Sequence, residues 1–261
     1  MNAKCYTIPA LTSLAVILGA LTAFAGQEMR EEFHQNYPLD KAGKVSLENV
    51  NGNVHVVTWD RDEVKVDAVK HAKKQEHLAE VKIEVDAKAD AIRIKTKYPD
   101  SRRSKNNSTS VDYTLTVPRQ SNLAKISTVN GGVEIENVSG DVEIHSVNGP
   151  VSATGLANVA ELSSVNGAVK AGFSQVKKDV SLKSVNGSVT VTVPKGTDAD
   201  LSASTLNGGI SSDFGLRAKT HFPVGKNLDT RLGKGGPAIK MSSVNGGIHI
   251  DCSNTMALEE R

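Results

Sequence analysis

The chain has 261 residues, with 31 Lys and Arg, 29 Asp and Glu, seven His and two Cys. This length is ample for one large domain, and a formal net charge of +2 gives no reason to expect a nucleic-acid partner. Valine occurs 30 times, whereas aromatic residues make up 4% of the chain. Such a composition favours packed β-strands over a helical globule, so it indicates an architecture and leaves the chemistry open.

Residues 1–25 are predicted to be a secretory signal peptide. Lys4 is their only charge, and an apolar run ends in the small-x-small sequence Ala23-Phe24-Ala25. The run is short for a membrane span, which favours cleavage over an uncleaved anchor and leaves no transmembrane segment afterwards. We therefore expect an exported protein of the periplasm, the cell surface or the medium.

Cys252 would be the one cysteine left after cleavage, so no internal disulfide is expected. It shares strand parity with Ile248 and Ile250, which predicts a small buried hydrophobic side chain.

After the signal peptide we expect a polar segment over 26–42, a β-repeat domain over 43–251 and a tail over 252–261. The domain divides by charge into 43–110 and 111–251. Between Trp59 and Ser104, 22 of 46 residues are charged, with both signs alternating, which is typical of a solvated face. The elements predicted in the charged part are strands at 44–49, 53–58, 63–70, 81–86 and 91–97, a turn at 59–62, a short helix at about 71–80, and an exposed loop at 99–109.

A repeat organises the rest of the chain. Its unit is a Ser or Thr, a Val or Leu, then Asn-Gly, followed by a short apolar strand, and the asparagines are 18, 18, 20, 21 and 38 residues apart from Asn130 onward. The last interval is about two periods, as if one turn had lost its marker. The copies of Asn-Gly begin at Asn51, Asn130, Asn148, Asn166, Asn186, Asn207 and Asn245.

Two folds compete for this pattern. Alternating segments such as Val133-Glu-Ile-Glu136 are typical of half-buried strands. Asn-Gly between strands is a hairpin signal, which predicts an antiparallel meander or sandwich. A near-constant period instead predicts a β-solenoid of about 18–21 residues per coil, in which stacked Asn and Ser/Thr side chains form hydrogen-bonded ladders. We favour the solenoid, because a hairpin does not require Ser or Thr two residues before each of the six asparagines from Asn130 onward.

The residues also resemble a known group. The stretch from Asn51 to Val66, the Val-Pro strand endings, the repeated Val-Asn-Gly-Gly and the segment from Gly233 to Ile239 are similar to the bacterial "putative-adhesin" β-strand-repeat family. The resemblance covers about 39–251. It implies a β-solenoid-like domain of unknown biochemical function in the cell envelope, and it brings no catalytic residues with it.

Catalytic, metal and cofactor motifs are not evident. His71 and His77 are six residues apart, which does not suit two ligands on one helical face. His145 and His249 are expected to point outward from different strands. The serines fit the repeat and lie in no Gly-x-Ser-x-Gly turn, and Gly233-Lys-Gly-Gly236 lacks the residues of a phosphate loop.

Two charged clusters could still carry a function. Glu134, Glu136, Asp141 and Glu143 are expected to face outward on adjacent strands, and paired carboxylates are what a glycoside hydrolase needs. The next coil places Ser152, Thr154 and then Lys170 outward, so a solvated face is the simpler interpretation. The stretch from Arg217 to Lys240 is rich in Lys and Arg and could touch an anionic envelope polymer.

We therefore predict an exported, non-enzymatic β-repeat protein of the bacterial envelope, with a binding, adhesion or scaffold role toward an unknown polymer or protein. The alternative is an envelope polysaccharide-active enzyme that uses Glu134, Glu136 and Glu143. No cofactor or metal is expected.

Overall fold

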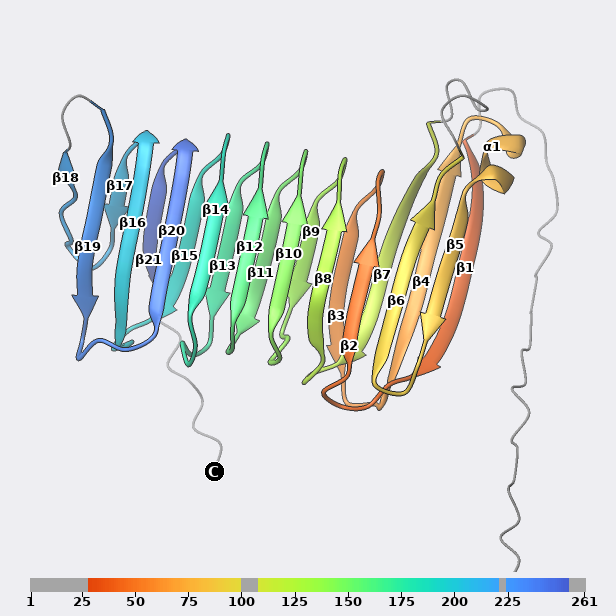
Figure 1. The fold of residues 1–261 in the computed structure, drawn as a ribbon, viewed down its shortest axis with the longest axis horizontal. Helices are drawn as coiled ribbons and strands as arrows, with labels where there is room; N and C mark the ends of the chain where they lie inside the picture. Colours follow the sequence, from red (N-terminus) through yellow and green to blue (C-terminus); the bar gives the residue numbers. More distant parts are fainter. Residues whose placement is uncertain (1–27, 100–107, 221–223, 254–261) are drawn as a thin grey trace, which may run out of the picture.

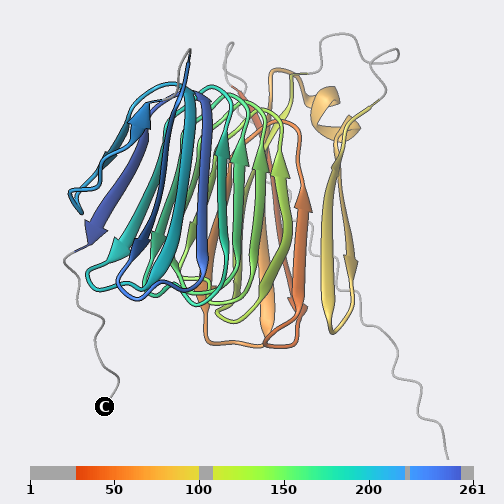
Figure 2. The same cartoon turned by 60° about the vertical axis from the view of Figure 1, so that its left-hand side comes forward.

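The computed structural model describes residues 28–99, 108–220 and 224–253. These residues form two long β-sheets, one of ten strands (sheet A) and one of eleven (sheet B), that face each other across the core (Figures 1 and 2). Nearly all of the regular structure is strand, which confirms the predicted all-β solenoid. One described helix, α1 (Gln75–Glu80), lies at one end, and no described helix could cross a membrane.

Spatial neighbours in each sheet are often distant in sequence. Sheet A runs in the order β1 (Met29–Pro38), β4 (Glu63–Ala72), β7 (Ser110–Pro118), β3 (Val54–Trp59), β9 (Val133–Glu136), β11 (Val151–Leu156), β13 (Val169–Phe173), β15 (Val189–Pro194), β21 (Ile248–Ser253), β17 (Ile210–Ser212). Sheet B runs β18 (Lys219–Thr220), β19 (Lys226–Leu232), β16 (Ala199–Asn207), β20 (Ala238–Asn245), β14 (Val180–Ser184), β12 (Ala160–Ser164), β10 (Val142–Ser146), β8 (Asn122–Thr128), β2 (Lys44–Glu48), β6 (Ala91–Lys97), β5 (Lys82–Ala87).

Each coil of the solenoid consists of one strand of sheet B, an Asn-Gly corner and one strand of sheet A. Equivalent strands of successive coils pair in parallel, so that Ile144 of β10 lies beside Leu162 of β12, and Val151 of β11 beside Val169 of β13. The corners line up along one long edge, the upper edge in Figure 1, which we call the Asn-Gly edge.

Aliphatic side chains fill the narrow space between the sheets. Along each strand, alternate residues are fully buried, as Val133 and Ile135 are in β9 and Val142 and Ile144 are in β10. Parallel in-register pairing stacks like upon like, so the core consists of rows of Val, Ile, Leu and Ala. This thin core explains why the chain has so few aromatic residues.

The hairpin alternative is wrong, and backbone angles explain why. Two-residue hairpins of the Asn-Gly type need positive φ at both central residues. Among the described residues, Asn137 is the one non-glycine residue with positive φ, and it lies outside the repeated corners. The Asn-Gly corners therefore join strands of different sheets instead of neighbours in one sheet.

The 38-residue interval does not come from a coil that lost its marker. After β15 the chain forms β16 and β17, which leave room for one strand in each sheet, and it continues through β18 and β19. It then returns, so that β20 lies between β14 and β16, and β21 lies between β15 and β17. Asn245 thereby takes its place between Asn186 and Asn207.

Antiparallel strands cover most of the ends of the parallel stack. At one end β5 pairs with β6, and β4 pairs with β7 while β1 pairs with β4. At the other end β19 pairs with β16, which leaves the three-residue β17 at the edge of sheet A. Short or capped edges limit pairing with other chains, and terminal caps are expected of a repeat fold.

The predicted asparagine ladder is present. Each side-chain amide Nδ2 donates to the Oδ1 of the asparagine in the adjacent coil, at 2.8–2.9 Å. The ladder runs in the spatial order Asn51, Asn130, Asn148, Asn166, Asn186, Asn245 and Asn207, and the Nδ2 of Asn51 donates to the Thr109 carbonyl.

The Ser/Thr column has a different partner from the one expected. Its hydroxyls do not bond to one another; each donates to the carbonyl of the corner glycine in the adjacent coil, as Ser164 does to Gly149 at 2.8 Å. The same contact is made by Thr128, Ser146, Ser184, Ser243 and Thr205, and all six side chains are buried.

The corner glycines are required by close packing. A methyl group built on Gly167 would overlap the Gly149 carbonyl oxygen, the atom that accepts the Ser164 hydroxyl. The same overlap occurs at Gly131, Gly149, Gly187, Gly208 and Gly246. Of the seven corner glycines, Gly52 is the one with positive φ, so the others serve to bring one coil's backbone against the next.

Several local predictions need correction. The helix begins at Gln75 rather than near His71, because β4 continues to Ala72 in pairing with β1. Strand β1 was not predicted, although Phe33 and Tyr37 pack against the core. Cys252 has the expected parity but is only half-buried, because β17 ends opposite Ile250.

Three predicted segments cannot be compared with the structure. The signal peptide over 1–25, most of the 99–109 loop and most of the 252–261 tail lie outside the described residues.

We expect Gly167→Ala to lower the free energy of unfolding by about 1–3 kcal/mol, because the methyl group must push two backbones apart. Gly209→Ala is the matched control. It also follows a corner, yet a methyl group there would have no neighbour within 4 Å, so its effect should stay within about 0.5 kcal/mol. Urea unfolding of both variants checks this, and equal losses would contradict the close-packing explanation.

Replacing Asn166 by alanine should cost about 1–2 kcal/mol, because Asn166 both donates and accepts in the ladder. Asn207 donates at the ladder's end, so Asn207→Ala should cost about 0.5–1 kcal/mol. The measurement is the shift in urea midpoint at constant slope. If Asn207→Ala proves as costly as Asn166→Ala, the ladder is not the source of the stability.

Candidate functional site: a groove on the outer face of sheet A

Outward-facing side chains of sheet A form rows that cross the strands. Parallel register places His55 of β3 between Thr114 of β7 and Glu134 of β9, and Ser152 of β11 follows Glu134. Strands are about 4.8 Å apart, so these four polar side chains span roughly 14 Å.

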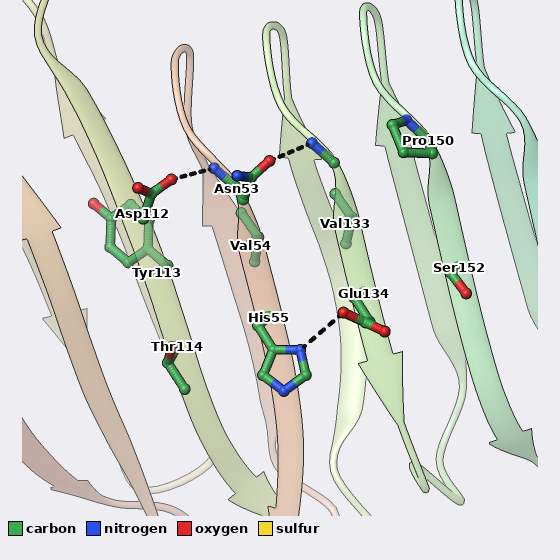
Figure 3. Close-up of a pocket in the computed structure, with 11 residues that line it drawn as sticks. Asn53, Val54, His55, Asp112, Tyr113, Thr114, Val133, Glu134, Pro150 and Ser152 are labelled. Carbon is green, nitrogen blue, oxygen red and sulfur yellow. Dashed lines mark hydrogen bonds and ion pairs between the residues drawn. The ribbon is translucent and has the colours of Figure 1, made fainter.

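A shallow groove of about 460 Å³ lies over this row, next to the Asn-Gly edge (Figure 3). Its upper wall is formed by the residues that follow the corners, and its floor is the sheet itself. The lining residues are Asn53, Val54, His55, Asp112, Tyr113, Thr114, Gly132, Val133, Glu134, Pro150 and Ser152.

Hydrogen bonds hold the upper wall of the groove in place. The Asp112 carboxylate accepts the Asn53 backbone N–H at 2.7 Å, and the Asn53 side-chain oxygen accepts the Gly132 N–H at 2.9 Å. The other Asp112 oxygen lies 3.5 Å from His71 Nε2. These contacts join β7, β3 and β9 at the same height (Figure 3).

The groove carries one histidine and two carboxylates, so its acidic groups outnumber its basic ones. His55 Nδ1 lies 3.6 Å from Glu134 Oε2, and the Glu134 side chain is 63% exposed. Behind the floor, the ring of Tyr113 is buried with its hydroxyl 2.7 Å from Thr96 Oγ1, and burial raises the pKa of Tyr113, so that it stays neutral. With two carboxylates and one histidine, the site suits hydroxyl and ammonium groups better than anions.

In the described residues no three His, Cys, Asp or Glu side chains come close enough together to hold a metal ion. The groove has carboxylates, one imidazole, an amide and hydroxyls, and all of these can donate or accept hydrogen bonds to a ligand.

The predicted acidic face does not exist as a unit. Glu134 and Glu136 lie on β9 in sheet A, whereas Glu143 lies on β10 in sheet B. Both strands turn their apolar residues toward the shared core, so these carboxylates point away from each other on opposite faces of the molecule. The prediction failed because consecutive strands of a solenoid alternate between sheets. Ser152 and Lys170 do follow Glu134 along the outer row, as expected.

On the opposite face, Ser163, His145 and Glu143 are aligned like a nucleophile, a base and an orienting acid. His145 Nδ1 lies 2.6 Å from Ser163 Oγ, and Nε2 lies 2.9 Å from Glu143 Oε1. Acyl transfer also needs free N–H groups that stabilise an oxyanion. Here β12 is paired on both sides, by β10 and β14, and the Val165 N–H donates to the Ser146 carbonyl, so the strand's backbone donors are already used.

The basic stretch from Arg217 to Lys240 is dispersed by the fold. Lys226 and Arg231 lie toward opposite ends of β19, and Lys240 lies on β20. Arg231 pairs with Asp200 of β16 at 3.0 Å, and Asp198 accepts the Lys234 N–H. Asp200 and Asp198, which are distant in sequence, therefore lie beside this stretch and offset part of its charge.

No sequence pattern predicts that Asn53, His55, Asp112 and Thr114 share a site. His55 and Thr114 are 59 residues apart and meet because the chain leaves after β3, builds β4, α1, β5 and β6, and returns as β7. The one local signal was the polar residue directly after the first Asn-Gly, Asn53, where most later copies have Gly, Pro or Ala.

Comparison with solved structures finds matches of low identity, and three of these have TM-scores below 0.5. A putative cell adhesion protein from Clostridium sporogenes is 13% identical, with a TM-score of 0.47 over 85% of this chain and 100% of that one. A putative adhesin from Bacteroides fragilis is 16% identical, with a TM-score of 0.31 over 85% of this chain and 97% of that one. A putative lipid binding protein from Parabacteroides distasonis is 12% identical, with a TM-score of 0.32 over 87% and 97%.

The curated proteins contain no match to the chain. The family model described as Toastrack DUF4097 matches residues 36–251, nearly all of the described structure. This match confirms the resemblance to a β-strand-repeat family of unknown function. The chain belongs to the Toastrack DUF4097 family.

Proposed function

We propose that this protein is an exported, non-enzymatic binding module of the bacterial cell envelope, and that the groove beside His55 holds part of an envelope polymer. The groove is the observation that carries this proposal, because it gathers side chains from β3, β7, β9 and β11 on one rigid face. Hydrogen bonds from backbone N–H groups to the side chains of Asp112 and Asn53 fix its wall before any ligand arrives, which lowers the entropy cost of binding.

Binding is favoured over catalysis by what the groove offers to a substrate. A glycosidase needs two carboxyl groups that flank one bond. In the groove, Asp112 is engaged by the Asn53 N–H and by His71, and Glu134 stands beside His55 on an open face. Neither carboxylate is enclosed, and an open polar groove suits recognition better than bond cleavage.

The chemistry of the groove selects among ligand classes. Two carboxylates disfavour anionic polymers, whereas Asn53, Thr114 and Ser152 can hydrogen-bond to hydroxyl groups. We therefore propose an amine-bearing or neutral polysaccharide. Since no aromatic side chain is exposed there for a sugar to stack on, affinity should be modest for each groove, and it would rise when several copies bind one polymer.

The test uses oligosaccharides of defined charge, namely chitosan oligomers (amine-bearing), cello-oligosaccharides (neutral) and hyaluronan oligomers (anionic), measured by calorimetry. We expect chitosan oligomers to bind best and hyaluronan oligomers least. Glu134→Gln should weaken chitosan binding about two- to fivefold, the effect of one exposed ion pair, and Asp112→Asn with Glu134→Gln should weaken it further. Binding should also fall as salt rises.

Glu143→Gln is the matched control, because Glu143 is a similarly exposed carboxylate on the outer face of sheet B. It should leave binding unchanged. Equal losses in Glu134→Gln and Glu143→Gln would remove the groove from the proposal, and release of shorter sugars from any oligomer would favour the hydrolase alternative.

Export is proposed from residues 1–25 alone. We expect the protein of a bacterial host to be found outside the cytoplasm and to start at Gly26, and a variant lacking residues 2–25 to stay in the cytoplasm. Cell fractionation with N-terminal mass spectrometry measures both. Full-length protein retained in the cytoplasm would contradict export.

A further inference from the structure

The Asn-Gly edge carries a continuous line of exposed aliphatic side chains. It consists of the residue before each ladder asparagine, which follows a buried Ser or Thr in six coils and the buried Asn49 in the first, and we call it the aliphatic ridge. Its members are 37–50% exposed and follow one another in the spatial order Val50, Val129, Val147, Val165, Val185, Val244 and Leu206.

Packing within the fold does not explain why every ridge residue is aliphatic. Outward positions two residues earlier are half-buried or exposed, and there the same coils carry Glu48, Ser127, His145, Ser163, Lys183, Ser242 and Ser204. Outward positions five residues later are equally varied, from His55 and Glu134 to Lys170 and Ser211. The ridge alone keeps Val or Leu in all seven copies, although polar side chains would fit.

Exposed aliphatic residues scattered over a surface need no explanation, but a contiguous line of them marks an interaction site. With about 4.8 Å between coils, seven residues extend over roughly 29 Å. A rigid row with this repeat is matched along its whole length by another stack of β-coils. In an extended peptide, the side chains on one face are about 6.6 Å apart. They would therefore fall out of register with the ridge residues within a few positions.

We propose that the aliphatic ridge is a self-association surface, on which a second copy of this chain packs its own ridge. The contact would be isologous, with the same residues on both sides, as in most homodimers. This inference concerns the Asn-Gly edge and does not depend on the proposed polymer groove.

Two two-fold arrangements bring the ridges together. An axis along the stack gives parallel solenoids, in which each coil meets the same coil of the partner. An axis across the stack at Val165 gives antiparallel ones, in which Val147 meets the partner's Val185. The charged residues His55, Lys125 and Glu161 already pair within the chain with Glu134, Glu48 and Lys183, so they do not choose between the two arrangements.

The ridge is narrow, so the dimer should be weak. Stable interfaces bury about 800 Å² on each partner, whereas one row of half-exposed valines with its polar flanks provides less than this. We expect dissociation constants between about 10 μM and 1 mM, the range of small, transient interfaces. A protein concentrated on one surface would reach such concentrations locally.

Sedimentation velocity of residues 26–261 from 5 μM to 1 mM tests the proposal. We expect reversible dimerisation that Val165→Lys weakens at least about tenfold. Val159→Lys is the matched control, since Val159 is 38% exposed but lies at the opposite corner, between β11 and β12. Val165→Ser gives a second variant that keeps the side chain small, and melting curves check that each variant is folded.

Arrangement is tested by cross-linking in a Cys252→Ser background. A parallel dimer brings Val147 beside the partner's Val147, so Val147→Cys should form a disulfide dimer; an antiparallel one would place it near the partner's Val185 and would not. A monomer at 1 mM, or a dimer that Val165→Lys and Val159→Lys affect equally, overturns the proposal. So does a monomer whose ridge binds phosphatidylcholine vesicles, because the occupant would then be a lipid surface.

Discussion

The fold depends on how closely one coil's backbone approaches the next at the Asn-Gly edge. At six of the seven corners the glycine carbonyl meets two groups of the neighbouring coil, the corner glycine that leaves room for it and the Ser or Thr hydroxyl that donates to it. A side chain on the glycine would collide, and without the hydroxyl a buried carbonyl would lose its hydrogen-bond partner. This contact fixes the spacing and register from which the asparagine ladder, the core rows and the outer rows all follow.

Contacts between successive coils could be predicted from the sequence, because equivalent positions of successive repeats lie side by side in a solenoid. The stacking of Asn148 on Asn130 and of Val169 on Val151 follows from an 18-residue interval and the period-two alternation. The direction each side chain faces was also predictable. The alternation alone does not say in which sheet a strand lies. The prediction that Glu134 and Glu143 share one surface is wrong for this reason, because the corner between them moves the chain to the other sheet.

The chain leaves the regular order of coils twice, once between β3 and β7 and once between β15 and β20. The strand pairings that result could not be predicted from the repeat. No local pattern says that β7 will return beside β3, or that β20 and β21 will insert ahead of β16 and β17. These pairings depend on free energies summed over whole strands, and strand order is weakly encoded when every strand has the same apolar alternation. The groove exists because the chain returns after β6 to place β7 beside β3, and no repeat in the sequence encodes this return.

Comparing positions within the chain separates structural constraint from other causes, because seven copies of one corner serve as controls for each other. Asn, Gly and Ser/Thr recur where their loss would break a specific contact. The outer rows vary from coil to coil, as expected where the fold sets no requirement, and a local departure such as His55 beside Glu134 is therefore a place to look for specificity. The aliphatic ridge fits neither case, since it is uniform where the fold would tolerate variation. Uniformity along its full length is what a partner with the same period would require, and this is why a second solenoid explains the ridge better than a ligand bound at one coil.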